Sequence, residues 1–323
     1  MPLQTKATTV DVAVVQASSV PFDADAGVAK ATDLIGDAAA KGAKVIVFPE
    51  AFIGGYPKGL TYGTVVGARD VAGREEFRLY LEAAIDVPGP YTERLGAAAA
   101  QHQAYVVIGV IERELNTCYC TVLFFGPDGG LLGKHRKLMP TAMERLIWGF
   151  GDGSTLTVVD SPYGRIGSVI CWENYMPMLR MAMYSKNVAL YCAPTADDRD
   201  TWLSSMQHVA LEGRCFVLTA CQHLKKSELP NSVRVSLGDS PDSVLMRGGS
   251  AIINPLGKVL AGPNYDGETI LTATLDLNEI ERGKFDFDVA GHYSRPDVFQ
   301  LIVNESATRP VTSVINTPRG RPD

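Results

Sequence analysis

The sequence predicts one domain of the α/β class, in which strands and helices alternate and pack in layers. Short β-rich runs alternate with helical stretches along most of the 323 residues, as they do in layered α/β domains. Several strand-like runs are apolar at consecutive positions, which is typical of strands covered on both faces. No linker rich in Pro and Ser and no internal repeat divides the chain. We therefore expect a single domain with a large core.

The individual elements follow from the hydrophobic pattern and from the residues that begin and end helices. Strands are expected at 10–17, 44–50, 105–111, 120–126, 165–171, 188–193, 215–221, 250–255 and 269–276. Helices are expected at 23–42, 75–85, 91–103, 177–187 and 201–214. The first helix is rich in alanine and stops at Gly42, and the fourth opens at Pro177, in keeping with the usual positions of Gly and Pro.

Two stretches stand apart from this alternation. Residues 225–243 are polar and rich in turn formers, so we expect a surface excursion there. From Ala307 the chain is rich in Pro, Thr and Arg. We therefore expect a domain over 1–306 and a mobile tail over 307–323.

Composition and charge exclude several classes of protein. Hydrophobic residues make up 46% and charged residues 20%, which excludes disorder over the whole chain. The net charge of −6 argues against a nucleic-acid partner, because phosphate backbones are bound by dense cationic faces. No apolar run reaches the roughly 18–20 residues that span a bilayer, and the first residues lack a signal-peptide pattern. We expect a cytoplasmic protein with no membrane partner.

The cysteines predict no metal site. None of the six forms a CxxC motif, and no two histidines stand at zinc-site spacing. Five lie in apolar, strand-like surroundings, where a thiol behaves as a small hydrophobic group: Cys118, Cys120, Cys192, Cys215 and Cys221. Cys171 is the exception, because it stands at a predicted strand-to-helix turn.

Three predicted strand ends carry reactive side chains. Glu50 follows VIVFP, Lys137 follows LLGKHR, and Cys171 follows RIGSVI. In α/β sheets, ligands bind beyond the carboxyl ends of strands. A thiol needs a base to become a nucleophile, and a cation or backbone amides to stabilise the anion that its attack creates. Taken singly, these residues also fit a plain strand end or a solvated basic turn, but together they favour thiol catalysis.

Four longer strings extend this pattern: FPEAFIGGYP, KHRKLMPT, ICWENYMP and CAPTADDRDTW. Their order and spacing resemble the nitrilase superfamily of carbon–nitrogen hydrolases and, within it, the nitrilase branch. The resemblance extends from VVQAS near residue 14 to GHYSRPDVFQL, which ends at Leu301. It implies a four-layer α-β-β-α sandwich, with two sheets flanked by helices. It also implies a homo-oligomer, a dimer or a larger spiral assembly.

The resemblance implies a role for each reactive residue. Glu50 would be the general base, Lys137 the cationic stabiliser and Cys171 the nucleophile. Glu144, in TAMERLIWGFGDGS, would be a fourth catalytic residue that positions the substrate and orients the lysine. From the residues alone, Glu144 and Arg145 also fit a surface ion pair.

The resemblance also suggests substrate-binding residues. The backbone N–H of Trp172 is a candidate donor to the reacting anion, and its indole is expected in the pocket or the core. Tyr56 and Thr141 are weaker pocket candidates, with plain packing as the alternative. His292, in GHYSRPD, matches a histidine of the nitrilase branch, and we assign it no catalytic role.

The implied reaction converts an organic nitrile to a carboxylic acid and ammonia through a thioimidate and a thioester on Cys171. It requires no cofactor and no metal. An amidase, a carbamoylase or a cyanide-hydrating enzyme of the same superfamily is the alternative, and the WEN string after Cys171 favours nitriles. A non-catalytic binding or scaffold protein would not require the intact set of Glu50, Lys137 and Cys171, and a redox-sensor role for the cysteines is a third alternative.

Overall fold

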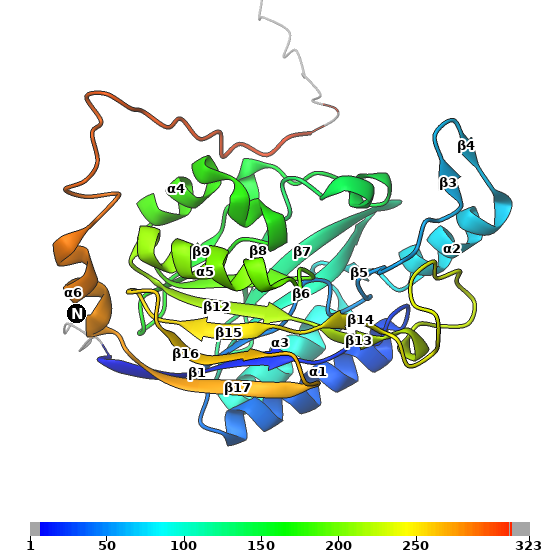
Figure 1. Cartoon of the computed structure of the whole chain (residues 1–323), viewed down its shortest axis with the longest axis horizontal. Helices are drawn as coiled ribbons and strands as arrows, with labels where there is room; N and C mark the ends of the chain where they lie inside the picture. Colours follow the sequence, from blue (N-terminus) through cyan, green and yellow to red (C-terminus); the bar gives the residue numbers. More distant parts are fainter. Residues whose placement is uncertain (1–6, 310, 312–323) are drawn as a thin grey trace, which may run out of the picture.

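Two β-sheets face each other at the centre of the molecule, and helices cover the outer face of each (Figure 1). The computed structural model describes residues 7–309 and 311. Helices α1 and α3 lie on one side of the paired sheets, and α4 and α5 lie on the other. The predicted α/β class and four-layer α-β-β-α arrangement are confirmed.

The first sheet has seven strands, of which β5 pairs only with β6. In spatial order they are β17 (Thr269–Asp276), β1 (Thr9–Gln16), β2 (Val45–Val47), β6 (Tyr105–Glu114), β7 (Thr117–Phe125) and β8 (Leu131–Arg136), with β5 (Ile85–Asp86) beside β6. The second sheet consists of β16 (Val259–Asn264), β15 (Ser250–Ile253), β12 (Phe216–Cys221), β11 (Val188–Thr195), β10 (Arg165–Ser168) and β9 (Val158–Val159).

Two small hairpins and the helices complete the fold. The hairpins are β3 (Thr64–Val65) with β4 (Ala68–Arg69), and β13 (His223–Lys225) with β14 (Val244–Arg247). The α-helices are α1 (Ala24–Ala40), α2 (Val71–Glu82), α3 (Pro90–His102), α4 (Pro177–Ser185), α5 (Asp200–Gly213) and α6 (Asn278–Asp286). Short 3₁₀ helices are η1 (Ala142–Leu146), η2 (Gly153–Thr155), η3 (Cys171–Tyr175) and η4 (Lys226–Glu228).

The central strands of each sheet run parallel. Strand β2 pairs in parallel with β1 and β6, and β11 pairs in parallel with β10 and β12. Antiparallel strands flank both sets. The carboxyl ends of β2, β10 and β11 are followed by the loops that carry the candidate site.

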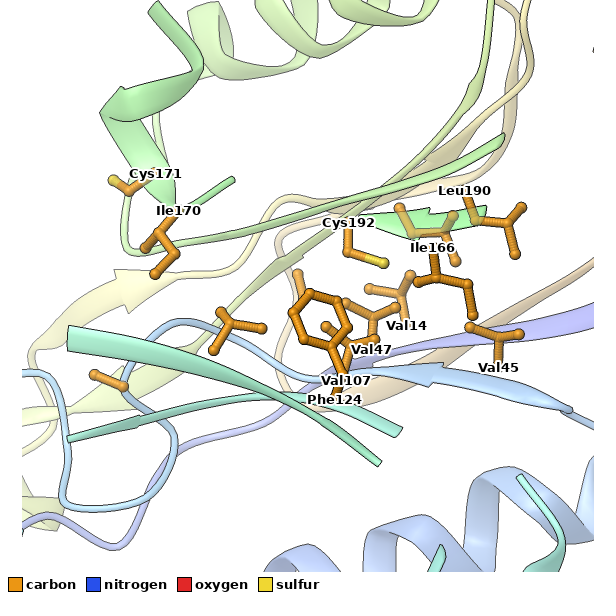
Figure 2. Close-up of a cluster of buried hydrophobic side chains, with 14 of the residues drawn as sticks. Val14, Val45, Val47, Val107, Phe124, Ile166, Ile170, Cys171, Leu190 and Cys192 are labelled. Carbon is orange, nitrogen blue, oxygen red and sulfur yellow. The ribbon is translucent and has the colours of Figure 1, made fainter. Parts of the chain in front are cut away.

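Three apolar layers hold the sandwich together. One lies between the two sheets, and the others lie between each sheet and its helices. Figure 2 shows the layer between the sheets, where Val47 and Phe124 of the first sheet face Leu190 and Cys192 of the second. Cys171 lies at the margin of this layer, apart from Cys192. Cys171 therefore lies at the edge of the hydrophobic core.

The helices form as their sequences predict. Helix α1 buries Val28, Ala31, Ile35 and Ala38, whose spacing of three or four residues places them on one face. The Asp23 carboxylate caps this helix by accepting the Ala26 N–H. Pro177 is the first residue of α4, as expected.

Several predicted boundaries were wrong. The strand expected over 44–50 ends at Val47, and the strand expected over 165–171 ends at Ser168, because the chain turns before each reactive residue. The helix expected over 75–85 begins at Val71, where Asp70 caps it, and ends at Glu82. Helix α6 and both small hairpins were not predicted, because these short or polar segments give little hydrophobic signal.

The excursion at 225–243 lies on the surface but is firmly attached. Arg234 binds Glu76 and Asp70, and the Ser236 N–H donates to the carbonyl of Gly59. The tail expected over 307–323 lies mostly outside the described residues; within them, the Thr308 N–H donates to Asp152. In the described part of the chain, no helix combines the length and apolarity needed to cross a membrane.

Candidate active site

A buried lysine lies between two carboxylates in the candidate site. The Nζ of Lys137 is 2.6 Å from Oε1 of Glu50 and 2.8 Å from Oε2 of Glu144. All three side chains are buried. An ammonium group has three N–H donors, and two of them hold the carboxylates.

Both sheets contribute to the site. Glu50 follows β2, and Lys137 follows β8 directly, so this pair comes from the first sheet. Cys171 follows β10, and Thr195 ends β11, so the thiol side comes from the second sheet. The Lys137 segment is fixed because its N–H donates to the carbonyl of Cys120 and its carbonyl accepts the Gly151 N–H.

Unusual backbone conformations shape three corners of the site. Cys171 has φ of 51°, Ala51 directly after Glu50 has φ of 51°, and Ala142 in the helical turn of Glu144 has φ of 47°. This left-handed region is uncommon for residues other than glycine and costs of order 1–3 kcal/mol each. The surrounding fold must impose these turns, which direct the reactive side chains into one place.

The charges of the two carboxylates and the lysine depend on one another. Burial raises the pKa of Glu50, and the nearby charge of Glu144 adds to this, while Lys137 acts in the opposite direction. Burial alone would lower the pKa of Lys137, but the charge of Glu50 raises that pKa well above its usual range. Lys137 therefore stays cationic, whereas Glu50 is disposed to accept a proton.

Cys171 lies within the electrostatic reach of this cluster. Burial, followed by the charge of Glu50, raises the pKa of the Cys171 thiol to about 12, and Lys137 opposes this rise. Sγ also accepts a hydrogen bond from Oγ1 of Thr195 at 3.2 Å. The resting thiol is protonated at neutral pH, so its attack must be accompanied by transfer of the proton to a base.

One oxygen of Glu50 is available for that proton. Oε1 binds Lys137 and accepts a hydrogen bond from the Cys120 thiol at 3.5 Å. The buried Oε2 has no hydrogen-bond partner within residues 7–309. Buried polar atoms are rarely left unpartnered without a functional reason. Cys120 was expected to be purely structural, and its contact with Glu50 was not predicted.

Two of the predicted pocket residues contact Glu144. The Tyr56 hydroxyl donates to Oε1 at 2.6 Å, and the Thr141 backbone N–H donates to Oε2 at 2.6 Å. Arg145 instead donates to the carbonyl of Pro140. The alternative of a surface Glu144–Arg145 ion pair is therefore wrong, because Glu144 is buried against Lys137.

Trp172 and His292 lie differently from each other. The indole of Trp172 is 41% exposed, and its Nε1 donates to Asp197 at 2.8 Å, so the ring stands at the rim of the site and not in the core. His292 is exposed and packs edge-on against Tyr293. No contact joins His292 to the site in the described chain.

Sequence reasoning missed a second buried pair. His135 and Glu173 lie two residues from Lys137 and Cys171 respectively, and they contact each other. His135 lies in the KHRK motif and Glu173 in the WEN motif, but nothing in the sequence predicts that these two residues, 38 positions apart, contact each other. Thr195, in CAPTADDRDTW, was likewise not predicted to contact Cys171.

A cleft of about 300 Å³ leads to Glu144. Its walls come from the loop at 56–62, from η1 and from the surface excursion. Most of the large side chains that line the cleft are apolar or aromatic, among them Tyr56, Leu60, Met143, Leu146, Ile147 and Leu237. The cleft suits a small molecule with an apolar body.

The described residues contain no group of three or more His, Cys, Asp or Glu side chains that could hold a metal ion. All six cysteines are free and buried. The candidate site brings together a thiol, two carboxylates and an ammonium group.

Comparison with known proteins agrees with this geometry. The family model described as carbon-nitrogen hydrolase matches residues 11–285. The chain is 65% identical to a nitrilase of Bradyrhizobium diazoefficiens over 94% of each chain. It is 61% identical to an aliphatic nitrilase of Sinorhizobium fredii, over 91% of this chain and 95% of that protein.

A solved structure supports the fold independently. The crystal structure of Nit3 from Saccharomyces cerevisiae, a member of branch 10 of the nitrilase superfamily, superposes with a TM-score of 0.65 at 21% identity. The match covers 89% of this chain and 97% of that one. On its sequence, its fold and the match over most of its length, the chain belongs to the carbon–nitrogen hydrolases of the nitrilase superfamily.

Proposed function

We propose that this protein is a nitrilase, which hydrolyses an organic nitrile to a carboxylic acid and ammonia. The observation that carries the proposal is the buried Lys137, held by Glu50 and Glu144 within electrostatic reach of the Cys171 thiol. The two nitrilases that share 65% and 61% identity with the chain support the same activity.

The first half of the reaction forms a covalent adduct. Oε2 of Glu50 takes the proton of Cys171 as Sγ bonds to the nitrile carbon. The C≡N bond becomes C=N, and its nitrogen receives that proton, which gives a thioimidate. Lys137 and the backbone N–H of Trp172 stabilise the developing negative charge, and losing one such donor typically costs about 100–1,000-fold in rate.

The second half consumes two water molecules. Glu50 accepts a proton from the first water as its oxygen adds to the thioimidate carbon, and the nitrogen then leaves as ammonia, which gives a thioester. A second water adds in the same way, the C–S bond breaks, and the sulfur recovers its proton. The sum is one nitrile and two waters to one carboxylic acid and one ammonia.

Replacement of the nucleophile tests the proposal. Cys171→Ser should fold and be nearly inactive, because an alkoxide is far harder to generate than a thiolate near neutral pH. Cys192→Ser is the matched control, since it changes a buried thiol in the layer between the sheets. Ammonia release by Cys171→Ser above a few per cent of the wild-type rate would place the nucleophile elsewhere.

A substrate panel separates nitrile hydrolysis from its alternatives. Aliphatic, aryl and arylacetonitriles, together with their amides, should be scored for ammonia, acid and amide. We expect acid and ammonia from nitriles with apolar bodies, in keeping with the apolar cleft beside Glu144. Faster turnover of the amides would favour an amidase, and no turnover of any compound would favour a scaffold.

We also propose that the enzyme acts in the cytoplasm. The six unpaired cysteines support this, because reducing compartments keep thiols free. Cell fractionation with an antibody against the protein tests it. Recovery of the protein outside the cytoplasmic fraction would contradict the proposal.

A further inference from the structure

A buried threonine hydroxyl contacts the sulfur of Cys171. Thr195 is the last residue of β11, and its side chain is fully buried. Its Oγ1 lies 3.2 Å from Sγ of Cys171. The contact arises because β10 and β11 pair in parallel, with Ser168 opposite Cys192, so that both chains leave the second sheet side by side.

The neighbouring backbone leaves the hydroxyl hydrogen of Thr195 available for this hydrogen bond. The Asp197 N–H donates to Oγ1 of Thr195 at 2.9 Å. A threonine hydroxyl has one hydrogen and two lone pairs, and the Asp197 N–H occupies one lone pair. The hydroxyl hydrogen is not used by the Asp197 contact, and in the structure Thr195 donates it to Sγ of Cys171.

The same segment holds the residue after the nucleophile. Asp197 accepts the indole N–H of Trp172 at 2.8 Å and is itself bound by Arg199. The Arg199 guanidinium lies 4.9 Å from the centre of the Trp172 ring. Residues 195–199 therefore contact both Cys171 and Trp172 in the turn that carries the nucleophile.

The charged surroundings of Cys171 make such a donor useful. Burial and the charge of Glu50 raise the pKa of the thiol, and Glu144 adds to the rise. Lys137 and the Thr195 hydrogen bond act against it. The titratable groups that interact with Cys171 from the elements packed around it are Glu50, Tyr56, Lys137, Glu144, Arg199 and Cys221. Unlike the carboxylates and Lys137, Thr195 carries no charge, and its hydroxyl contacts Sγ of Cys171 directly.

We propose that Thr195 is a further catalytic residue, whose hydroxyl stabilises the Cys171 thiolate and orients its sulfur for attack. The proposal rests on the proposed function, in which Cys171 is the nucleophile. As the S–H bond breaks and its proton moves to Glu50, the O–H···S bond strengthens because its acceptor becomes charged. When the C–S bond later breaks, the same hydroxyl stabilises the departing thiolate.

Three variants test this role. Thr195→Val removes the hydroxyl while keeping the shape, and Thr195→Ser keeps the hydroxyl. Ser168→Ala is the matched control, because it removes a buried hydroxyl of β10 that has no hydrogen-bond partner within residues 7–309. Each protein is assayed for ammonia release and for alkylation of Cys171 by iodoacetamide between about pH 7 and pH 9, followed by peptide mass spectrometry.

The expected results separate a catalytic role from a structural one. Thr195→Val should lower both kcat and the alkylation rate of Cys171 by about 10–100-fold, with KM changed less than about threefold, because the donor acts on the thiolate and not on the bound substrate. Thr195→Ser should recover most of both losses. Ser168→Ala should match the wild type in both measurements.

Two outcomes would overturn the proposal. One is that Cys171 in Thr195→Val is alkylated at the wild-type rate, whether or not turnover falls. The other is that Thr195→Ser does not recover the lost turnover and alkylation rate. If Thr195→Val does not fold, Thr195→Ala replaces it, because it removes the hydroxyl without placing a methyl group against the Asp197 N–H. Failure of the proposed function gives a different result. Turnover by Cys171→Ser would show that Cys171 is not the nucleophile. If Cys171→Ser is inactive while Thr195→Val keeps full reactivity, only the role of Thr195 is contradicted.

Discussion

The imidazole of His135 lies 3.0 Å from the carboxylate of Glu173, and this buried contact joins the lysine segment to the nucleophile turn. The other ring nitrogen of His135 faces the carbonyl oxygen of Thr155 at 3.0 Å. The Glu173 carboxylate also accepts the backbone N–H groups of Leu138 and Ile170. Because both ring nitrogens face acceptors while the carboxylate faces donors, the pair is an imidazolium and a carboxylate.

His135→Gln should destabilise the protein by about 3–5 kcal/mol, because it leaves a buried carboxylate without its charged partner. Urea unfolding followed by circular dichroism measures this. His208→Gln is the control, since His208 pairs with Glu212 at 3.5 Å on the surface. Equal stability of His135→Gln and wild type would show that the pair is not charged.

The stability conferred by His135 should also depend on pH. Burial disfavours the charged ring, but Glu173 and the Thr155 carbonyl together raise the pKa of His135 above its ordinary value of 6.5. The contribution is therefore complete below pH 6.5 and is lost as the pH rises through the higher pKa of the folded state. The difference in unfolding free energy between wild type and His135→Gln should shrink over that rise. A difference that grows with pH would contradict the assignment.

Glu50→Gln should abolish both halves of the reaction. One carboxylate is assigned to the thiol proton and to both water steps, and an amide cannot accept these protons. Mass spectrometry after mixing with a nitrile should find no covalent adduct. Accumulation of a thioester would restrict Glu50 to the last step, and normal turnover would remove it from the mechanism. Glu76→Gln, at a buried carboxylate bound to Arg234, is the control.

Tyr56→Phe should lower kcat by about 10–100-fold, because a hydrogen bond to a charged group contributes about 1.5–3 kcal/mol. The lost bond is the one to Glu144, which orients Lys137. Tyr191→Phe is the matched control, since its buried hydroxyl has no partner in the described chain. Steady-state kinetics with one nitrile measures the effect; equal kcat values for the two variants would mean that Tyr56 only packs.

We propose that the protein is a homo-oligomer, at least a dimer, whose activity falls on dilution. The C-terminal part of the chain supports this, because an extended segment after α6 exposes apolar side chains, among them Phe299 and Ile302 at 79% and 90% exposure. Met178 of α4 is 72% exposed as well, whereas Leu179 packs inward. Size-exclusion chromatography with light scattering decides the matter: a fully active monomer near 34.8 kDa would refute the proposal.

Much of the fold could be predicted because its central strands are apolar on both faces. Most residues around Val14, Val107 and Leu190 are buried, and their pattern is local to the sequence. The left-handed turn at Cys171 could not be predicted, because tertiary contacts impose it on a residue that does not favour it. The contacts of Thr195 and His135 also escaped prediction, since each joins residues that only the parallel pairing of strands and the packing of sheets bring together.

Because the site is divided between two sheets, the rate of its reaction should depend on the distance between those sheets. Glu50 and Lys137 are attached to strands of one sheet, and Cys171 is attached to a strand of the other. Val47 and Leu190 therefore act as spacers for a reaction that they do not touch. A change of an ångström in reacting geometry can cost about 100-fold in rate, so altering the size of these spacers should tune turnover, while substitutions on the cleft walls should tune the choice of nitrile.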